Sequence, residues 1–256
     1  MPGQPVRSMP SRVMRSVRDI ARAAGFDVVR YQPTSHYLAR RAQLLRAHSV
    51  DLVLDVGAND GQYAAEIRRF GYQGRIVSFE PLPDAVERLK ARRAADAAWE
   101  IRGVALGDEP GMMTINIAGN SASSSLLPML PAHERYAPGT SSVGETRVPV
   151  QRLDEIAEAV LSGADRPFLK IDTQGFEARV LDGASTTLDQ IAGVQIEISI
   201  VPLYAGAPLA MEMLERVGAY GFELMGIEPG FSDADSGRLL QFDGVFFRPE
   251  LTSSAI

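Results

Sequence analysis

The stretch DLVLDVGANDG, residues 51–61, decides the fold. Its short apolar run LVL predicts a buried strand that ends at Asp55. Gly57 and Gly61 follow four residues apart, which predicts a tight turn between this strand and a helix. A strand, a glycine turn and a helix in this order are typical of α/β folds.

Strand and helix patterns alternate along the rest of the chain. Further strands are predicted over residues 75–80, 100–106, 112–117, 167–172, 194–200, 222–227 and 242–247, with helices over 62–70, 84–95, 153–161 and 209–220 and from 176. Such alternation implies right-handed crossovers and a parallel sheet. The last two strands have no helix between them, so one should be antiparallel. We expect an α/β fold with a mostly parallel seven-stranded sheet and helices on both faces.

Charge divides the chain unevenly. Residues 1–48 contain nine arginines against two aspartates and are expected to form a basic helical extension, whereas the other residues have 17 basic and 30 acidic side chains. Residues 49–250 are expected to form one domain and 251–256 a tail. An acidic domain would repel a polyphosphate, which argues against a nucleic-acid partner. The arginines fit a solvated helix face or, alternatively, an acidic lipid headgroup or partner.

Composition excludes several other classes of site. The chain has no cysteine, so it has no disulfide, thiolate metal site or cysteine nucleophile. No apolar run approaches the ~18 residues of a membrane span. The first residues lack the apolar region of a secretory signal, so we expect a cytoplasmic location.

Ligands of open α/β sheets bind beyond the carboxyl ends of the strands, and this chain has acids there. The Gly57–Gly61 spacing lacks the close glycine pair of the dinucleotide fingerprint, and Asp55 would repel a pyrophosphate. The same acid suits the cationic sulfonium and amino end of S-adenosylmethionine. Glu80, at the end of the second strand, is placed to accept both ribose hydroxyls. The alternative is a generic glycine turn with a solvated Glu80.

Four segments together resemble the FkbM-type methyltransferase family. They read VLDVGANDGQYAAEIRRFGYQGRIVSFEPLP, GVALGDEPG, VPVQRLDEI and FLKIDTQGFEARVLDGA, in the family's order, between about Leu52 and Glu197. The resemblance implies a Rossmann-like class I methyltransferase domain that methylates a hydroxyl of a sugar, polysaccharide, glycolipid or glycosylated secondary metabolite. The family often has an acid where this chain has Gln174.

The cofactor residues come from this resemblance and from the strand ends. By position, the resemblance places Asp55, Gly57, Asn59, Gly61 and Glu80 at S-adenosylmethionine, with Ala105 and Leu106 beside its adenine. The full expected set adds Ala58, Pro81, Ser124 and Asp172.

A sugar hydroxyl is a poor nucleophile, so methyl transfer to its oxygen needs a base or a metal ion that helps to remove the proton. His133 lies in the serine-rich insert 118–148, which we expect to form a substrate lid over the cofactor. We therefore predict His133 and Asp172 as the catalytic residues. The alternative for His133 is a solvated loop histidine.

Acidic residues after two central strands are expected to face the acceptor. Asp172 and Glu197 either hold Mg²⁺, which prefers oxygen ligands, or hydrogen-bond to the sugar. Glu177, about one helical turn further, is expected to join them at the acceptor. Tyr204 could stack on a sugar ring or, equally well, pack in the core.

Three rival functions stay open at this level. A nucleic-acid or protein methyltransferase shares the core, but DTQG replaces the N/D-P-P-Y/F motif of base amino-methylation. A dehydrogenase is disfavoured by the missing G-x-G-x-x-G motif. A non-catalytic S-adenosylmethionine-binding scaffold is the third. We expect a small-molecule or carbohydrate acceptor, and a homodimer is a reasonable assembly for such a protein.

Overall fold

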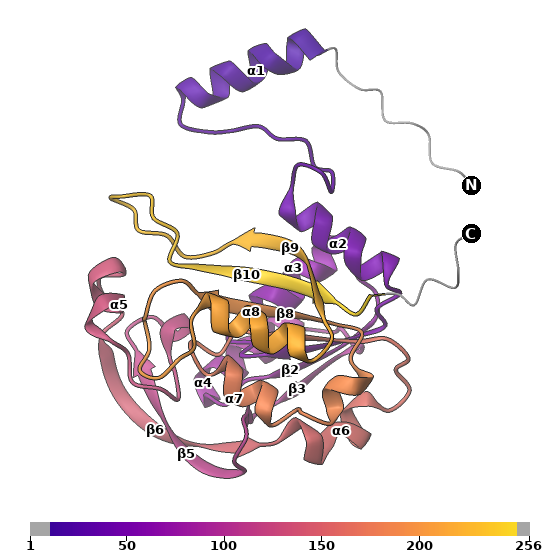
Figure 1. The fold of residues 1–256 in the computed structure, drawn as a ribbon, viewed down its shortest axis with the longest axis vertical. Coiled ribbons are helices and arrows are strands. Elements are labelled where there is room, and N and C mark those ends of the chain that lie inside the picture. Colours follow the sequence, from indigo (N-terminus) through magenta and orange to yellow (C-terminus); the bar gives the residue numbers. More distant parts are fainter. Residues whose placement is uncertain (1–10, 250–256) are drawn as a thin grey trace.

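The computed structural model describes residues 11–249. The first ten residues of the predicted extension and the predicted tail lie outside the described residues. Helix α1 (Ser11–Ala23) lies apart from the rest of the described chain, whereas α2 (Tyr37–Ala47) packs against the body of the molecule (Figure 1). No helix within residues 11–249 is long and apolar enough to cross a membrane.

Seven strands form the main sheet, in the order β3-β2-β1-β7-β8-β10-β9. They are β1 (Leu52–Val56), β2 (Arg75–Phe79), β3 (Trp99–Arg102), β7 (Pro167–Ile171), β8 (Gly193–Ser199), β9 (Glu223–Pro229) and β10 (Gln241–Phe247). β10 is antiparallel to both of its neighbours, so the sheet is mixed rather than purely parallel. The chain changes direction across the sheet between β1 and β7, the place where α/β folds bind ligands.

Helices cover both faces of this sheet, as expected. Every residue of β1 and β7 is buried, the charged Asp55 and Lys170 included, which fits central strands covered on two sides. On one face, Val53 packs with residues of α2 and α3 (Gln62–Arg69). On the other, Leu52 and Leu54 pack with α6 (Leu153–Leu161), α7 (Glu177–Asp182) and α8 (Ala210–Ala219). Helix α4 (Pro83–Arg93) follows β2.

A second, three-stranded sheet has the order β4-β6-β5. It consists of β4 (Ala105–Leu106), β5 (Gly111–Ala118) and β6 (Ser142–Gln151). The single strand predicted over 100–106 is therefore wrong, because the chain leaves the main sheet at Gly103. The insert 118–148 also has more structure than its sequence suggested, with η1 (Ser121–Ser123), α5 (Pro131–Tyr136) and the start of β6. Most of β6 is exposed, so its apolar alternation is weak.

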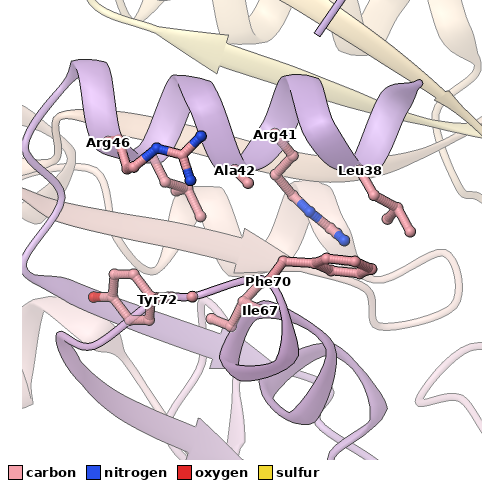
Figure 2. Close-up of a pocket in the computed structure, with 9 residues that line it drawn as sticks. Leu38, Arg41, Ala42, Arg46, Ile67, Phe70 and Tyr72 are labelled. Carbon is pink, nitrogen blue, oxygen red and sulfur yellow. The ribbon is translucent and has the colours of Figure 1, made fainter. Parts of the chain in front are cut away.

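Helix α2 belongs to the predicted extension but packs against the domain. Figure 2 shows a small pocket between α2 and the end of α3, lined by Leu38, Arg41, Ala42, Leu45, Arg46, Ile67, Phe70, Gly71 and Tyr72, with about 320 Å³ of empty space. Arg41 is only 4% exposed and forms ion pairs with Glu66 and, at 3.3 Å, with Glu228. A charged side chain of the extension is thus built into the domain.

Candidate active site

Two pockets meet where the chain direction changes between β1 and β7. The first, which we name the apolar pocket, has about 550 Å³ of empty space and walls that include Val56, Phe79, Leu82, Ala105, Leu106 and Phe176. The second, the polar pocket, has about 990 Å³ and lies toward α2, β8, β9 and β10. Both are lined by Gly57, Asn59, Ala122, Asp172 and Gln174. The shared wall is therefore the place where two bound molecules could meet.

Glu80 lies in the wall of the apolar pocket, as predicted. Its two carboxylate oxygens accept hydrogen bonds from the backbone N–H groups of Asn59 (2.8 Å) and Leu82 (2.9 Å). Burial raises the pKa of Glu80, and these two donors partly oppose that shift. Because a carboxylate oxygen can accept more than one hydrogen bond, Glu80 can also receive two vicinal hydroxyls.

Seven other predicted cofactor residues also line the apolar pocket. They are Gly57, Asn59, Pro81, Ala105, Leu106, Ser124 and Asp172. Gly57 has a φ of +74°, and a Cβ there would lie 1.9 Å from the backbone oxygen of Asp172. This position needs glycine because the turns after β1 and β7 touch.

Three predicted cofactor residues lie elsewhere. Asp55 is fully buried, lines neither pocket, and is bound by Ser78 Oγ (3.1 Å) and by Lys170 Nζ (3.3 Å). Gly61 also lines neither pocket. Packing requires glycine at this position, because a Cβ would lie 2.5 Å from the Leu89 side chain and 3.0 Å from that of Trp99. Ala58 faces the polar pocket instead of the apolar one. Asp55 thus has protein partners and no exposed surface in this structure, and its contact with the cofactor stays a prediction.

Lys170 is a buried cation in the wall of the polar pocket, a place that its sequence context did not predict. Its Nζ lies 3.3 Å from Asp55 Oδ1 and 3.5 Å from Asp172 Oδ2. Burial disfavours its charge, but Asp172, Asp55 and Asp243 together outweigh that effect and raise the pKa of Lys170. It therefore stays protonated and fixes Asp172 at the shared wall.

Asp172 and Glu197 approach each other, as predicted, but a neutral amide joins them. Gln174 Nε2 donates to Asp172 Oδ1 and to Glu197 Oε2, both at 2.9 Å, and Gln241 Nε2 donates to the same Glu197 oxygen at 2.8 Å. Within residues 11–249 no three or more His, Asp or Glu side chains are arranged to hold a metal ion. The predicted magnesium site is unsupported, because amide donors occupy these carboxylates.

Glu177 shapes the loop after β7 and lines neither pocket, contrary to its predicted contact with the acceptor. Its Oε1 accepts from the backbone N–H groups of Thr173 (2.8 Å) and Gly175 (3.1 Å) and from the Thr173 hydroxyl. Burial raises the pKa of Glu177 to about 7 despite these donors. Its carboxylate holds Gln174 between two anchored residues.

Tyr204 is buried in the core, so the packing alternative for this residue is the one observed. Its hydroxyl lies 2.8 Å from Gln174 Oε1 and 3.1 Å from the backbone oxygen of Ser123, and its ring packs against Gly175. Tyr204 therefore orients the amide of Gln174 and does not line either pocket.

His133 does not reach the two pockets, which argues against its predicted role as general base. The side chain is 3% exposed, its Nδ1 lies 3.2 Å from Thr140 Oγ1, and its ring packs against Tyr204 and Phe231. Burial lowers its pKa. The imidazole stabilises the insert from inside.

The insert contributes to the wall of the apolar pocket, while its role as a substrate lid stays a prediction. Ser121, Ser124 and Ser125 line that pocket. Ser121 Oγ donates to Asn59 Oδ1 (3.0 Å), and Ser125 Oγ donates to the backbone oxygen of Gln174 (2.7 Å). Ser124 Oγ accepts from the Ala118 backbone N–H at 3.1 Å, so this predicted cofactor residue is partly committed to its own loop.

Several pocket residues escaped prediction from the sequence. Arg41, Tyr63, Gln195, Glu228 and Asp243 all line the polar pocket. Tyr63 lies inside the first family-like motif, whereas the other four lie outside the quoted motifs. The only sequence signal for these four is a polar residue within or directly after a predicted helix or strand.

Comparisons with known proteins identify the family of this chain. The model of the methyltransferase FkbM domain matches residues 55–224. The 2-O-methyltransferase NoeI of Sinorhizobium fredii (strain NBRC 101917 / NGR234) is 26% identical over 183 residues, which cover 68% of this chain and 74% of that protein.

Two solved structures are more distant. The rRNA methylase from Streptococcus thermophilus is 14% identical, with a TM-score of 0.43 over 83% of this chain and 96% of that one. The TehB-like SAM-dependent methyltransferase from Corynebacterium glutamicum is 15% identical, with a TM-score of 0.38 over 93% and 97%. Similarities this distant say nothing about the substrate.

The family model spans more than half of the chain and includes the turn after β1, Glu80 and the loop after β7. The chain therefore belongs to the FkbM methyltransferase family, whose members are S-adenosylmethionine-dependent methyltransferases.

Proposed function

We propose that this protein methylates a hydroxyl of a sugar, free or within a polysaccharide, glycolipid or glycosylated metabolite. The observation that carries the proposal is the contact between the apolar and polar pockets at Asp172 and Gln174. The name of the relative NoeI, a 2-O-methyltransferase, supports oxygen as the methylated atom.

The residues of the apolar pocket fit S-adenosylmethionine. Glu80 can accept the ribose hydroxyls, since each of its oxygens is already fixed by one backbone donor. Ala105, Leu106 and Phe79 supply apolar walls for an adenine ring. When bound, S-adenosylmethionine supplies the methyl group, as an electrophile attached to a positively charged sulfur.

Asp172 is the residue that serves best as general base. It lines both pockets, its side chain is 34% exposed, and it is held by Lys170 on one oxygen and Gln174 on the other. A carboxylate oxygen of Asp172 accepts the proton that the acceptor hydroxyl loses as the oxygen forms its bond to the methyl carbon. The fixed position of this carboxylate also orients the hydroxyl.

Calorimetry with S-adenosylhomocysteine tests the cofactor assignment. We expect binding by the wild type and at least about tenfold weaker binding by Glu80→Gln, because the hydroxyls lose an ionised acceptor. Glu87→Gln, on the exposed face of α4, is the matched control. Lack of binding by the wild type, or equal binding by Glu80→Gln, contradicts the proposal.

A further inference from the structure

A row of acidic side chains crosses the polar pocket. Asp243 on β10 pairs in register with Glu197 on β8 and with Glu228 on β9. Asp172 follows Ile171, which pairs with Ile196 next to Glu197, so it extends the row to the shared wall. All four carboxylates line the polar pocket. Strands lie about 4.8 Å apart, so this acidic row spans about 14 Å.

The row has too few cations to balance it. The lining of the polar pocket contains five acids but only two bases, Arg41 and Lys170. Lys170 pairs with Asp172 at one end of the row, and Arg41 pairs with Glu228 at the other. Like charges directly opposite each other destabilise a sheet. In the middle of the row, Glu197 accepts from the amides of Gln174 and Gln241, and Asp243 accepts from that of Gln195, but neither forms an ion pair with a described cation. Burial, with the neighbouring acids, raises the pKa of both carboxyls, as expected where negative charge is crowded.

Glu228 gives an independent sign of a ligand. The residue is 6% exposed, and its Oε2 lies 3.3 Å from an Arg41 nitrogen. Its Oε1 is buried and has no hydrogen-bond partner among the described residues, although the residue lines the pocket. Buried polar atoms are normally paired with protein groups, ligands or ordered water, so this oxygen is an acceptor that the described residues leave open. Burial raises the pKa of Glu228 to about 7, against the effect of Arg41, as expected for such a site.

We propose that the acidic row is the subsite for the non-reacting part of the acceptor, and that it selects a hydroxyl-rich sugar without negative charge, with an ammonium group favoured. The proposal rests on the function proposed above. Sugar hydroxyls and an ammonium group are hydrogen-bond donors, which carboxylates accept. A uronate or a sugar phosphate would bring a like charge to a partly desolvated acidic wall. The length of the row fits an acceptor longer than a single sugar ring.

Saturation-transfer NMR on the protein loaded with S-adenosylhomocysteine tests this selectivity. The probes are glucosamine, glucose and glucuronic acid, which share one ring and differ in charge. We expect the affinity to fall in the order glucosamine, glucose, glucuronic acid, with a ratio of about ten between the first and the last. In the double variant Glu228→Gln, Asp243→Asn this affinity ratio should fall toward one. Glu223→Gln, at the exposed start of β9, should leave the order unchanged.

Three results overturn the proposal: glucuronic acid binding as tightly as glucose, the same order in the double variant, or no binding of any probe. If the double variant is unfolded by circular dichroism, Asp243→Asn alone is used. Calorimetry with S-adenosylhomocysteine separates the two proposals. Failure of that ligand to bind, with the sugar order intact in unloaded protein, removes the methyltransferase function and leaves the subsite.

Discussion

Gln174 donates a hydrogen bond of 2.9 Å from its side-chain amide to Oδ1 of Asp172, the carboxylate that lies in both pockets. The same amide reaches Glu197, while Tyr204 bonds its oxygen at 2.8 Å. The two carboxylate acceptors fix which end of the amide faces them, and the tyrosine hydroxyl binds the other end. The site of this protein is therefore built around a neutral donor at a position where the family often has an acid.

Replacing Gln174 by Glu should convert this neutral bridge into a cation site. The variant loses the donor between Asp172 and Glu197 and places three carboxylates together, so it should be less stable without metal. We expect Mg²⁺ to raise the melting temperature of Gln174→Glu but not of the wild type, as measured by thermal unfolding. Gln190→Glu, at the exposed end of η2 (Thr187–Gln190), is the control. An equal response of wild type and Gln174→Glu would contradict this prediction.

Asp172→Asn should lower kcat by a factor of about 10²–10⁴, because an amide cannot take the hydroxyl proton. His133→Asn should keep the wild-type kcat, since His133 lies outside both pockets. The release of S-adenosylhomocysteine in the presence of a sugar acceptor measures both. A loss of kcat in folded His133→Asn, with Asp172→Asn active, would restore the histidine as the base.

Gly57→Ala should destabilise the fold by about 3–5 kcal/mol or prevent folding. Its Cβ would lie 1.9 Å from the backbone oxygen of Asp172, and β1 and β7 cannot separate without breaking the sheet. Gly139→Ala is a matched control, because it also has a positive φ, +89°, but meets no atom within 4 Å. It should cost only about 1–2 kcal/mol of backbone strain. Urea unfolding measures both, and equal costs would show that the turns can separate.

Glu177→Gln should flatten the dependence of stability on pH. The folded-state pKa of Glu177 is about 7, above its ordinary 4.5, so its contribution to stability is full below 4.5 and is lost as pH rises through about 7. Between acidic pH and a pH above 7, the wild type should lose more free energy of unfolding than Glu177→Gln, by about 3 kcal/mol at most. Urea unfolding at a series of pH values measures the difference. Glu155→Gln, exposed on α6, should behave like the wild type. The same slope in wild type and Glu177→Gln would contradict the prediction.

The sequence by itself determined the elements and their class. The short, largely apolar runs of β1 and β7 predict buried strands, and the glycine turn with Glu80 predicts the pocket beyond their ends. These features are local, because strand spacing, turn residues and strand ends can be read from neighbouring positions along the chain.

Only the tertiary structure decided what surrounds the reacting atoms. Asp55 is a predicted cofactor contact, and only the pairing of β1 with β7 puts Lys170 beside it. Arg41, Glu228 and Asp243 reach the polar pocket from segments far apart in sequence. Their meeting depends on strand order, on the register of β8, β9 and β10, and on the packing of α2. Local spacing does not encode these three properties, because the free energy that fixes them comes from contacts between distant segments.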